Sequence, residues 1–493
     1  MKLLDSIQKL GNRLPDPSVL FIFGTILVFI LSMIISELDI TTTSAASSEV
    51  IINNLLTSHG IWWFLSSMVD NFISFPPLGI VLVGMLGIGL AEKTGFLPAL
   101  LKFITIRTHE CLLTPMVMFL GILSSIALDA GYVVLIPLAA SLYLTAGRSP
   151  LLGIAVAFAG VSAGFSANLF ITALDPLLAG FTQLGAQIIE PSYVVAVTAN
   201  WWFMIASTIV LTLTGWYVTE KIAAPLIANT PIIKIKENNK SEKTNNKALL
   251  FSFFAFIFLL TIFYLSVISE NTPLFGKGEN FDRWVEVTVP LLFIIFFIPG
   301  LIFGILSGKI KNSNDLAKIL GDVLSTLGPY IVLAFFAAQF IAAFNYSGLG
   351  HLLAITGGEF LKNLDIENAL LLSCFILMAS IVNIFIGSSS AKYAFFAPVF
   401  VPMLMQIGIS PELTQLSYRI GDSVTNVITP MNPYMIIILI EIKKYLKGSG
   451  LGTVISMMLP YTIYFLIVWL VLLLFWMHMG WPLGPGGNLS YQI

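Results

Sequence analysis

The sequence predicts an all-α integral membrane protein with about nine transmembrane helices and two re-entrant helical hairpins, arranged as an inverted repeat. Three observations lead to this prediction. Of the 493 residues, 57% are hydrophobic and only 10% are charged, so the chain is too apolar to be soluble. Apolar runs long enough to cross a bilayer recur along it. One pattern of Pro, Gly and Ser residues occurs twice.

The repeated pattern covers residues 129–162 and 390–423, which align without a gap at an offset of 261 residues. Most of the shared residues set backbone geometry rather than fill volume. In a membrane protein, two halves built alike predict a transporter whose site lies at the repeat interface. The identities are Ala130/Ala391, Tyr132/Tyr393, Pro137/Pro398, Gly147/Gly408, Ser149/Ser410, Pro150/Pro411, Leu152/Leu413, Gly160/Gly421 and Ser162/Ser423.

Lysine and arginine orient the first half, because they are retained on the cytoplasmic side. With the N-terminus inside, residues 18–38 form the first span, residues 39–75 an outer loop without Lys or Arg, and residues 77–97 the second span. Residues 111–146 have basic flanks and a polar interruption, which predicts a hairpin open to the cytoplasm. Two ordinary spans are the alternative, but each would have only about 16 residues.

The third span starts at residue 150 and is broken at residues 160–168, and the fourth covers residues 192–219. Residues 221–247 then form a cytoplasmic loop with six lysines, which reads as a disordered linker. This basic loop divides the chain into a first half, residues 1–220, and a second half, residues 248–493.

The second half is threaded in the same way. Its spans are residues 248–268, 285–306, 327–346, a broken span 411–440, and 454–476, with a hairpin at 369–407 that opens outward. Of the 24 basic residues, 19 then lie inside, 3 outside and 2 within membrane segments. The two hairpins therefore open to opposite sides, as alternating access requires, and the C-terminus lies outside.

Backbone that leaves helical geometry inside a membrane is tolerated where it lines a cavity or is buried in protein. Each half supplies a hairpin tip and a broken span, and Asn168 and Asn426 lie in the two breaks. In the second half, an amide, free carbonyls and a carboxylate are the hard oxygen ligands that a small cation prefers. Asn383, Gly387 and Asp422 are therefore interpreted as a sodium site. The alternative is that Asn383 and Asp422 only cap broken helices.

Further ionisable and aromatic residues at membrane depth are functional candidates. Arg419 either pairs with Asp422, three residues away on the same helix face, or binds a substrate carboxylate. Lys392 either neutralises an anion or extends toward the outer interface. Tyr393 offers an aromatic face and a hydroxyl, although its repeat partner hints at packing. Asp129 and Asp175 are candidate ion or proton carriers, and Asp175 before Pro176 is equally suited to capping a helix.

Several motifs closely resemble the aminobenzoyl-glutamate transporter (AbgT) family. They are Ser-Ser-Ser-Ala-Lys-Tyr-Ala-Phe-Phe-Ala-Pro (388–398), Ser-Tyr-Arg-Ile-Gly-Asp-Ser-Val-Thr-Asn-Val-Ile-Thr-Pro-Met-Asn-Pro-Tyr (417–434), Gly-Trp-Tyr-Val-Thr-Glu-Lys (215–221) and Gly-Trp-Pro-Leu-Gly-Pro-Gly-Gly (480–487). The likeness covers nearly the whole chain. It implies a homodimer of nine-span, two-hairpin protomers in the bacterial inner membrane. It also implies cation-coupled import of p-aminobenzoyl-glutamate, or export of antimetabolites such as sulfonamides, coupled to protons or sodium.

The resemblance also assigns residues. Asn383, Gly387 and Asp422 fall where the family places its cation ligands. The positions that the family is expected to need for transport are Asp175, Ser390, Pro411, Arg419 and Pro430 of this chain. One departure is Tyr393, where family members commonly have Trp, and it puts the substrate preference in question.

The expected partners are a small anionic substrate and the lipid bilayer, with no nucleic acid and no organic cofactor. A sodium-coupled dicarboxylate symporter is the alternative within the transporter class. An intramembrane aspartyl protease would need two facing catalytic aspartates, and a passive channel would favour a symmetric filter. The chain has no phosphate-binding loop motif, so an ion gradient or a partner must drive transport.

Overall fold

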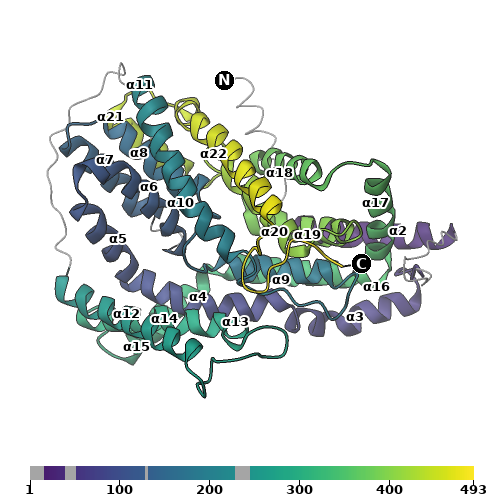
Figure 1. Ribbon diagram of the computed structural model, residues 1–493. Coiled ribbons are helices and arrows are strands. Elements are labelled where there is room, and N and C mark those ends of the chain that lie inside the picture. Colours follow the sequence, from purple (N-terminus) through teal and green to yellow (C-terminus); the bar gives the residue numbers. More distant parts are fainter. Residues whose placement is uncertain (1–15, 39–50, 128–130, 228–244, 493) are drawn as a thin grey trace.

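The computed structural model describes residues 16–38, 51–127, 131–227 and 245–492, and this part of the chain is helical (Figure 1). Eight of its helical segments are long and apolar enough to cross a membrane, which confirms the predicted all-α membrane class. They are Pro17–Glu37, Ser58–Thr94, Trp201–Ile227, Asn246–Ile268, Thr288–Leu306, Gly328–Tyr346, Asn368–Phe385 and Leu451–Met479.

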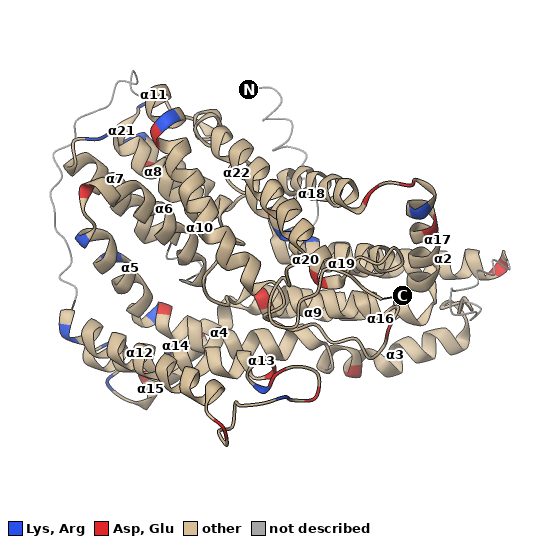
Figure 2. Cartoon of the chain, in the orientation of Figure 1, with Lys and Arg blue, Asp and Glu red and all other residues tan. Residues whose placement is uncertain are grey.

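Seven of these segments contain predicted spans, and the eighth, Asn368–Phe385, is an arm of the second hairpin. The two predicted spans that are missing from this set are the broken ones, because each of their halves is too short to qualify alone. Figure 2 shows Lys, Arg, Asp and Glu residues mostly at helix ends and in connections, with a small group near α9, α19 and α20. The exposed helix surfaces are therefore largely apolar, as a bilayer requires.

The first four helices are α2 (Pro17–Glu37), α3 (Ser58–Ile73), α4 (Pro76–Thr94) and α5 (Phe96–Arg107). Helix α3 corrects the sequence prediction, which treated residues 39–75 as a loop. It starts at a Thr57 cap, whose side chain accepts from the Gly60 N–H, and it ends before the proline pair that opens α4. Its position against α16 is supported by Trp63, which stacks on Tyr346 of that helix.

The first hairpin consists of two short arms. The first arm contains η1 (Glu110–Leu112), α6 (Leu113–Leu123) and η2 (Ser124–Ala127). The second arm contains the π-helical turn η3 (Gly131–Leu135) and α7 (Ile136–Thr145). The predicted polar interruption therefore coincides with a loss of regular α-helix, as the hairpin interpretation requires.

The first broken span follows as predicted. It comprises α8 (Pro150–Phe158), a π-helical turn η4 (Ala159–Ala163), a non-helical stretch, and α9 (Leu174–Ala186). Next come α10 (Trp201–Val218), η5 (Thr219–Ala223) and α11 (Ala224–Ile227). Residues 221–227, predicted as the start of the disordered linker, are therefore helical, and residues 228–244 lie outside the described part.

The second half begins with α12 (Asn246–Ile268), α13 (Arg283–Glu286) and α14 (Thr288–Leu306). Helices α15 (Ser313–Thr326), α16 (Gly328–Tyr346) and α17 (Leu349–Asn363) follow, and α15 and α17 were not predicted. The second hairpin is α18 (Asn368–Phe385) and α19 (Ser389–Met405), with its tip where it was predicted. The chain ends with α20 (Pro411–Val424), α21 (Met435–Tyr445) and α22 (Leu451–Met479).

The two broken spans run antiparallel to each other. Helix α20, the first part of its span, packs against α9, the last part of the other span, and α21 packs against α8. Each hairpin packs against the broken span of its own half, α6 and α7 on α8, and α18 and α19 on α20. This pairing is the arrangement expected of an inverted repeat.

One hydrogen bond recurs in both halves. Asn168 Nδ2 in the first break donates to the Ile122 carbonyl at 3.3 Å, and Thr429 Oγ1 in the second break donates to the Ile384 carbonyl at 2.9 Å. Asn168 and Thr429 are separated by the repeat offset, 429 − 168 = 261. Each break is therefore tied to the first arm of its own hairpin by a side chain at the same place in the repeat.

Candidate functional site

The cluster predicted to bind sodium forms where α18, α19 and α20 meet. Asn383 Nδ2 donates to the Asp422 carbonyl at 2.5 Å, to Thr425 Oγ1 at 2.9 Å and to Asn426 Oδ1 at 2.9 Å. A backbone carbonyl can only accept, so this nitrogen is fixed as the donor and the Asn383 oxygen points away from the break. The amide thus ties the end of α18 to the end of α20.

Lys392 occupies the centre of this cluster. Its Nζ lies 2.5 Å from Asp422 Oδ1 and also contacts Asn383 Oδ1, and the exposed fractions of the Lys392 and Asp422 side chains are 1% and 0%. The Tyr418 hydroxyl donates to the Ser389 carbonyl at 2.6 Å and lies 3.2 Å from Asp422 Oδ1, whereas Asp422 Oδ2 is buried without a hydrogen-bond partner. Lys392 therefore neutralises the carboxylate and does not extend toward an interface.

Arg419 has a different partner from the one predicted. Its Nη1 lies 2.5 Å from Asp175 Oδ1 on α9, so the predicted alternative of a pair with Asp422 is wrong. Spacing on one helix allowed that pair, but the packing of α20 against α9 gives Arg419 a carboxylate from the other half. Arg419 Nη2 also donates to the Ser166 carbonyl at 3.4 Å, and Nε is buried without a partner.

Asp175 pairs with Arg419 and also accepts hydrogen bonds from Thr172, just before α9 begins. Its Oδ2 accepts from the Thr172 backbone N–H at 2.6 Å and from Thr172 Oγ1 at 2.8 Å, at the point where α9 begins after the first break. A carboxylate there also faces the positive end of the helix dipole. The N-cap of α9 is Ala173, without a side-chain hydrogen bond, so Asp175 does not cap the helix as the alternative had it; it joins the two halves through Arg419.

Two buried ion pairs therefore lie close together along α20, one to the hairpin and one to α9. Removing one partner of a buried pair typically costs about 3–5 kcal/mol, because the other charge is left uncompensated. Of the remaining ionisable candidates, Asp129 lies outside the described residues.

A small polar cavity of about 170 Å³ opens where the breaks meet the tip of the second hairpin. Asn432 Nδ2 donates to Ser162 Oγ at 3.1 Å across the two breaks, and Asn426 Nδ2 reaches the Ser162 carbonyl at 3.5 Å. The cavity thus lies at the repeat interface and combines amide, hydroxyl and aromatic groups. Its lining residues are Tyr132, Phe165, Gly387, Ser389, Asn426, Asn432, Pro433 and Tyr434.

The aromatic part of the cavity comes from both halves. The rings of Tyr132 and Tyr434 are stacked, with centroids 3.9 Å apart and planes 7° from parallel. Tyr393, for which an aromatic face toward the site and packing were the two alternatives, is fully buried, which favours packing. Its hydroxyl lies 2.7 Å from Thr182 Oγ1, and its ring packs on Tyr418, so it joins α19 to α9 and α20.

The other predicted positions lie along the second hairpin and the second broken span. Pro411 is the first residue of α20, after the Ser410 cap. Pro430 lies in the second break, and Ser390 is half-buried, with its hydroxyl 3.4 Å from Ser388 Oγ. Gly387 lines the cavity at the hairpin tip, where an added Cβ would lie 2.5 Å from the Met431 carbonyl oxygen.

Sequence reasoning missed several residues of this site. Ser389, whose buried Oγ has no hydrogen-bond partner, lines the cavity in place of its neighbour Ser390. Asn432 and Tyr434 stand in the quoted Thr-Pro-Met-Asn-Pro-Tyr motif but were not singled out. The repeat alignment did signal Tyr132, because it pairs with Tyr393, yet it does not say which of the two tyrosines faces a cavity.

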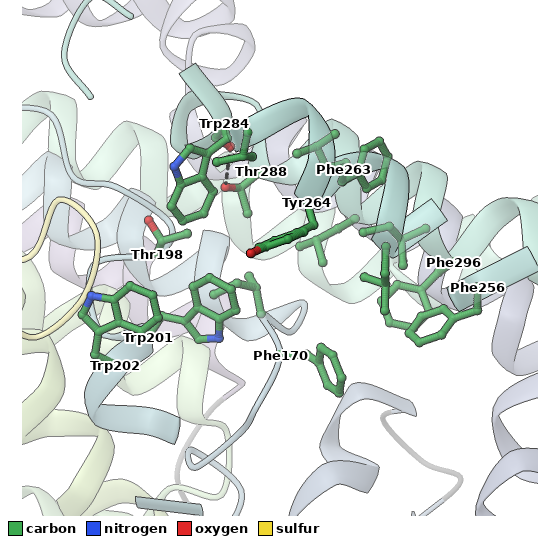
Figure 3. A pocket seen from close by; sticks show the side chains of 16 residues that line it. Phe170, Thr198, Trp201, Trp202, Phe256, Phe263, Tyr264, Trp284, Thr288 and Phe296 are labelled. Carbon is green, nitrogen blue, oxygen red and sulfur yellow. Dashed lines mark hydrogen bonds between the residues drawn. The ribbon is translucent and has the colours of Figure 1, made fainter. Parts of the chain in front are cut away.

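A second cavity, of about 370 Å³, lies between α12, α14 and the start of α10 (Figure 3). Its labelled side chains are mainly aromatic, and they include the stacked pair Trp201 and Trp202 together with Tyr264 and Trp284. None of the described residues that line it is charged. It suits an apolar ring or an acyl chain and offers no ionic partner to a carboxylate.

The side-chain oxygens of Asn383 and Asp422 are suitable ligands for a small cation. Asp422 presents a buried carboxylate oxygen without a partner, and Asn383 Oδ1 points toward the same ammonium. Carboxylate and amide oxygens are ligands that hard cations prefer. Gly387, the third predicted ligand, lies at the hairpin tip, where it lines the neighbouring cavity against Met431.

The sequence and the structure are both similar to those of known transporters. A sequence model described as the AbgT putative transporter family matches residues 2–491. The p-aminobenzoyl-glutamate transport protein of Escherichia coli (strain K12) is 32% identical over 489 residues, which are 98% of this chain and 96% of that protein.

Two solved structures share the fold. The YdaH transporter of Alcanivorax borkumensis superposes with a TM-score of 0.92 at 39% identity, over 96% of this chain and 100% of that one. MtrF of Neisseria gonorrhoeae, which is described as illuminating a class of antimetabolite efflux pumps, superposes with a TM-score of 0.89 at 40% identity, over 99% and 100%.

Proposed function

This chain belongs to the AbgT putative transporter family, and from that premise we propose that it is a cation-coupled secondary transporter of p-aminobenzoyl-glutamate or a related folate-pathway compound. The observation that carries the proposal is the polar cavity at the meeting point of both broken spans and a hairpin tip. A site between inverted halves is open to alternating access, because rocking one half against the other changes the side from which it is reached.

The cavity fits the chemistry of the proposed substrate. The stacked Tyr132 and Tyr434 present an aromatic surface suited to an aminobenzoyl ring. The amides of Asn426 and Asn432 and the hydroxyl of Ser389 are suited to the amide and carboxylate groups. Arg419 then holds α20 against α9 through Asp175 and keeps these groups in place.

In the proposal, Asn383 and Asp422 hold the coupling cation, with the Gly387 carbonyl as the third expected ligand. A bound sodium ion, or a proton in its place, supplies positive charge that offsets the carboxylate and tightens the contact between α18 and α20. Asp422→Asn or Asn383→Ala is expected to shift the sodium dependence of transport, because each removes a charge or an oxygen ligand from a site of few ligands.

The proposal also includes the membrane, the oligomeric state, the topology and a second activity. We place the protein in the bacterial inner membrane as a homodimer, with the N-terminus in the cytoplasm and the C-terminus outside. Export of sulfonamide antimetabolites is the second activity, which the likeness to MtrF favours. The substrates of both activities share one feature, an aromatic amine joined to a polar group.

The test is flux in proteoliposomes. Radiolabelled p-aminobenzoyl-glutamate and a sulfonamide are offered under imposed sodium or proton gradients, with succinate as competitor. We expect saturable flux that collapses when the gradient is dissipated and is insensitive to succinate. Flux that ignores both gradients would exclude cation coupling, and competition by succinate would favour a dicarboxylate symporter.

A further inference from the structure

We propose that Lys392 is a tethered cation that occupies the coupling-cation site, so that a free cation binds only by displacing its ammonium group. This inference rests on the proposed function, because it concerns the same oxygen ligands. It adds a residue to the coupling mechanism, and it states what neutralises the site when no free cation is present.

The first support is positional. Lys392 Nζ contacts the side-chain oxygens of both Asn383 and Asp422, two of the three ligands predicted for sodium. The three acceptors around Asn383 Nδ2 fix the direction of its amide oxygen toward this ammonium. A free cation that uses the same two oxygens must therefore take the place of Nζ.

The second support is the charge balance. Lys392 and Asp422 neutralise each other, and Arg419 and Asp175 neutralise each other, so these two buried ion pairs carry no net charge. A sodium ion added beside a docked Lys392 would leave a net positive charge in a low-dielectric interior. If Lys392 moves away, sodium restores neutrality at Asp422, and the buried Oδ2 without a partner becomes available to it.

The third support is the place of Lys392 in the fold. It lies in the first turn of α19, directly after the hairpin tip, whereas Asp422 is near the end of α20. The ion pair therefore fastens the tip to the second break. While Lys392 is docked, the cation-free carrier keeps its carboxylate neutralised and its hairpin closed on α20. When a free cation displaces the Lys392 ammonium, the contact between the hairpin tip and α20 is weakened. When the ammonium returns, the contact forms again.

The test is sodium binding to the purified full-length protein without substrate, measured with radioactive sodium. Lys392→Met removes the competing charge at similar length, and we expect it to bind sodium about tenfold more tightly than the parent or better. Lys392→Arg keeps a tethered charge and should gain no affinity. Lys362→Met, at an exposed lysine of α17, is the matched control and should bind as the parent does.

Lys392→Gln, whose amide can still donate to Asn383, replaces the methionine variant if that variant does not fold. Sodium affinity within twofold of the parent in the uncharged variants, or no sodium binding in any variant, overturns the proposal. New sodium binding in Lys392→Met alone supports it. The proposed function is judged separately by the gradient dependence of parental flux, so the two failures are distinguishable.

Discussion

At the scale of single residues, Arg419 carries the clearest prediction. It bonds to Asp175 across the two halves, so the single variants Arg419→Asp and Asp175→Arg should each destabilise the protein by about 3–5 kcal/mol. The double variant, which restores opposite charges at the same place, should recover part of the loss. Thermal unfolding in detergent measures both effects.

The control for this prediction is a swap with the other nearby carboxylate. Arg419→Asp combined with Asp422→Arg should recover nothing, because Asp422 faces Lys392. Recovery by this second swap, and not by the first, would return Arg419 to the partner that helix spacing suggested.

A second variant of Arg419 tests whether this residue positions α20 or binds the substrate. Arg419→Lys keeps the charge but loses the planar fork that reaches both Asp175 and the Ser166 carbonyl. If Arg419 only positions α20, unfolding temperature and substrate affinity should fall together in this variant. A loss of affinity of about 1–3 kcal/mol without loss of stability, measured by direct binding, would instead place a substrate carboxylate on its guanidinium.

These residues show where sequence reasoning works and where it ends. Asn383, Lys392, Arg419 and Asp422 were recognised as candidates because polar groups at membrane depth are rarely accidental. The grouping of Asn383 with Asp422 was predicted, but the partners of Lys392 and Arg419 were not, because spacing along one helix describes only local neighbours. Lys392 meets Asp422 through the packing of the hairpin on α20, a contact between segments that the sequence does not place together.

At the scale of elements, the hairpin tip depends on a close approach of two backbones. An added Cβ at Gly387 would lie 2.5 Å from the Met431 carbonyl oxygen, so Gly387→Ala must push the tip away from the second break. Overpacking of this kind typically costs about 1–3 kcal/mol. We expect lower stability and a marked loss of transport.

Gly321→Ala in α15 is the matched control, because nothing lies within 4 Å of its added Cβ and α15 is a regular helix. It should leave transport unchanged and stabilise the helix slightly. Parental flux in Gly387→Ala, at parental expression, would show that the tip does not need this approach.

The elements that the sequence failed to predict share a physical cause. Helices α3, α5, α15 and α17 have 16, 12, 14 and 15 residues, and each mixes polar with apolar positions. They fall short of the run of about 20 apolar residues that marks a span. The hairpins and breaks were found because Pro, Gly and Ser interrupt apolar sequence, and such residues act on the backbone locally.

At the scale of the whole molecule, the repeat alignment anticipated the pairing of the two broken spans. It did so with few identities, because residues that set backbone geometry are shared while the packing residues differ. The antiparallel packing of α20 on α9 and of α21 on α8 agrees with an inverted repeat. The direction of each hairpin relative to the bilayer rests on the distribution of basic residues, and it stays a prediction.

That prediction can be tested with a probe that the chain already carries. Cys111 is a free, exposed cysteine at the open end of the first hairpin, and Glu367 is exposed at the open end of the second. In a Cys374→Ser background, an impermeant maleimide should label Cys111 only from the cytoplasmic side. In the same background with Cys111→Ser, Glu367→Cys should be labelled only from the outer side, because inversion puts the two open ends on opposite faces. Inside-out and right-side-out vesicles supply the two directions of access, and labelling of both positions from one side would show that the hairpins enter the membrane from the same face.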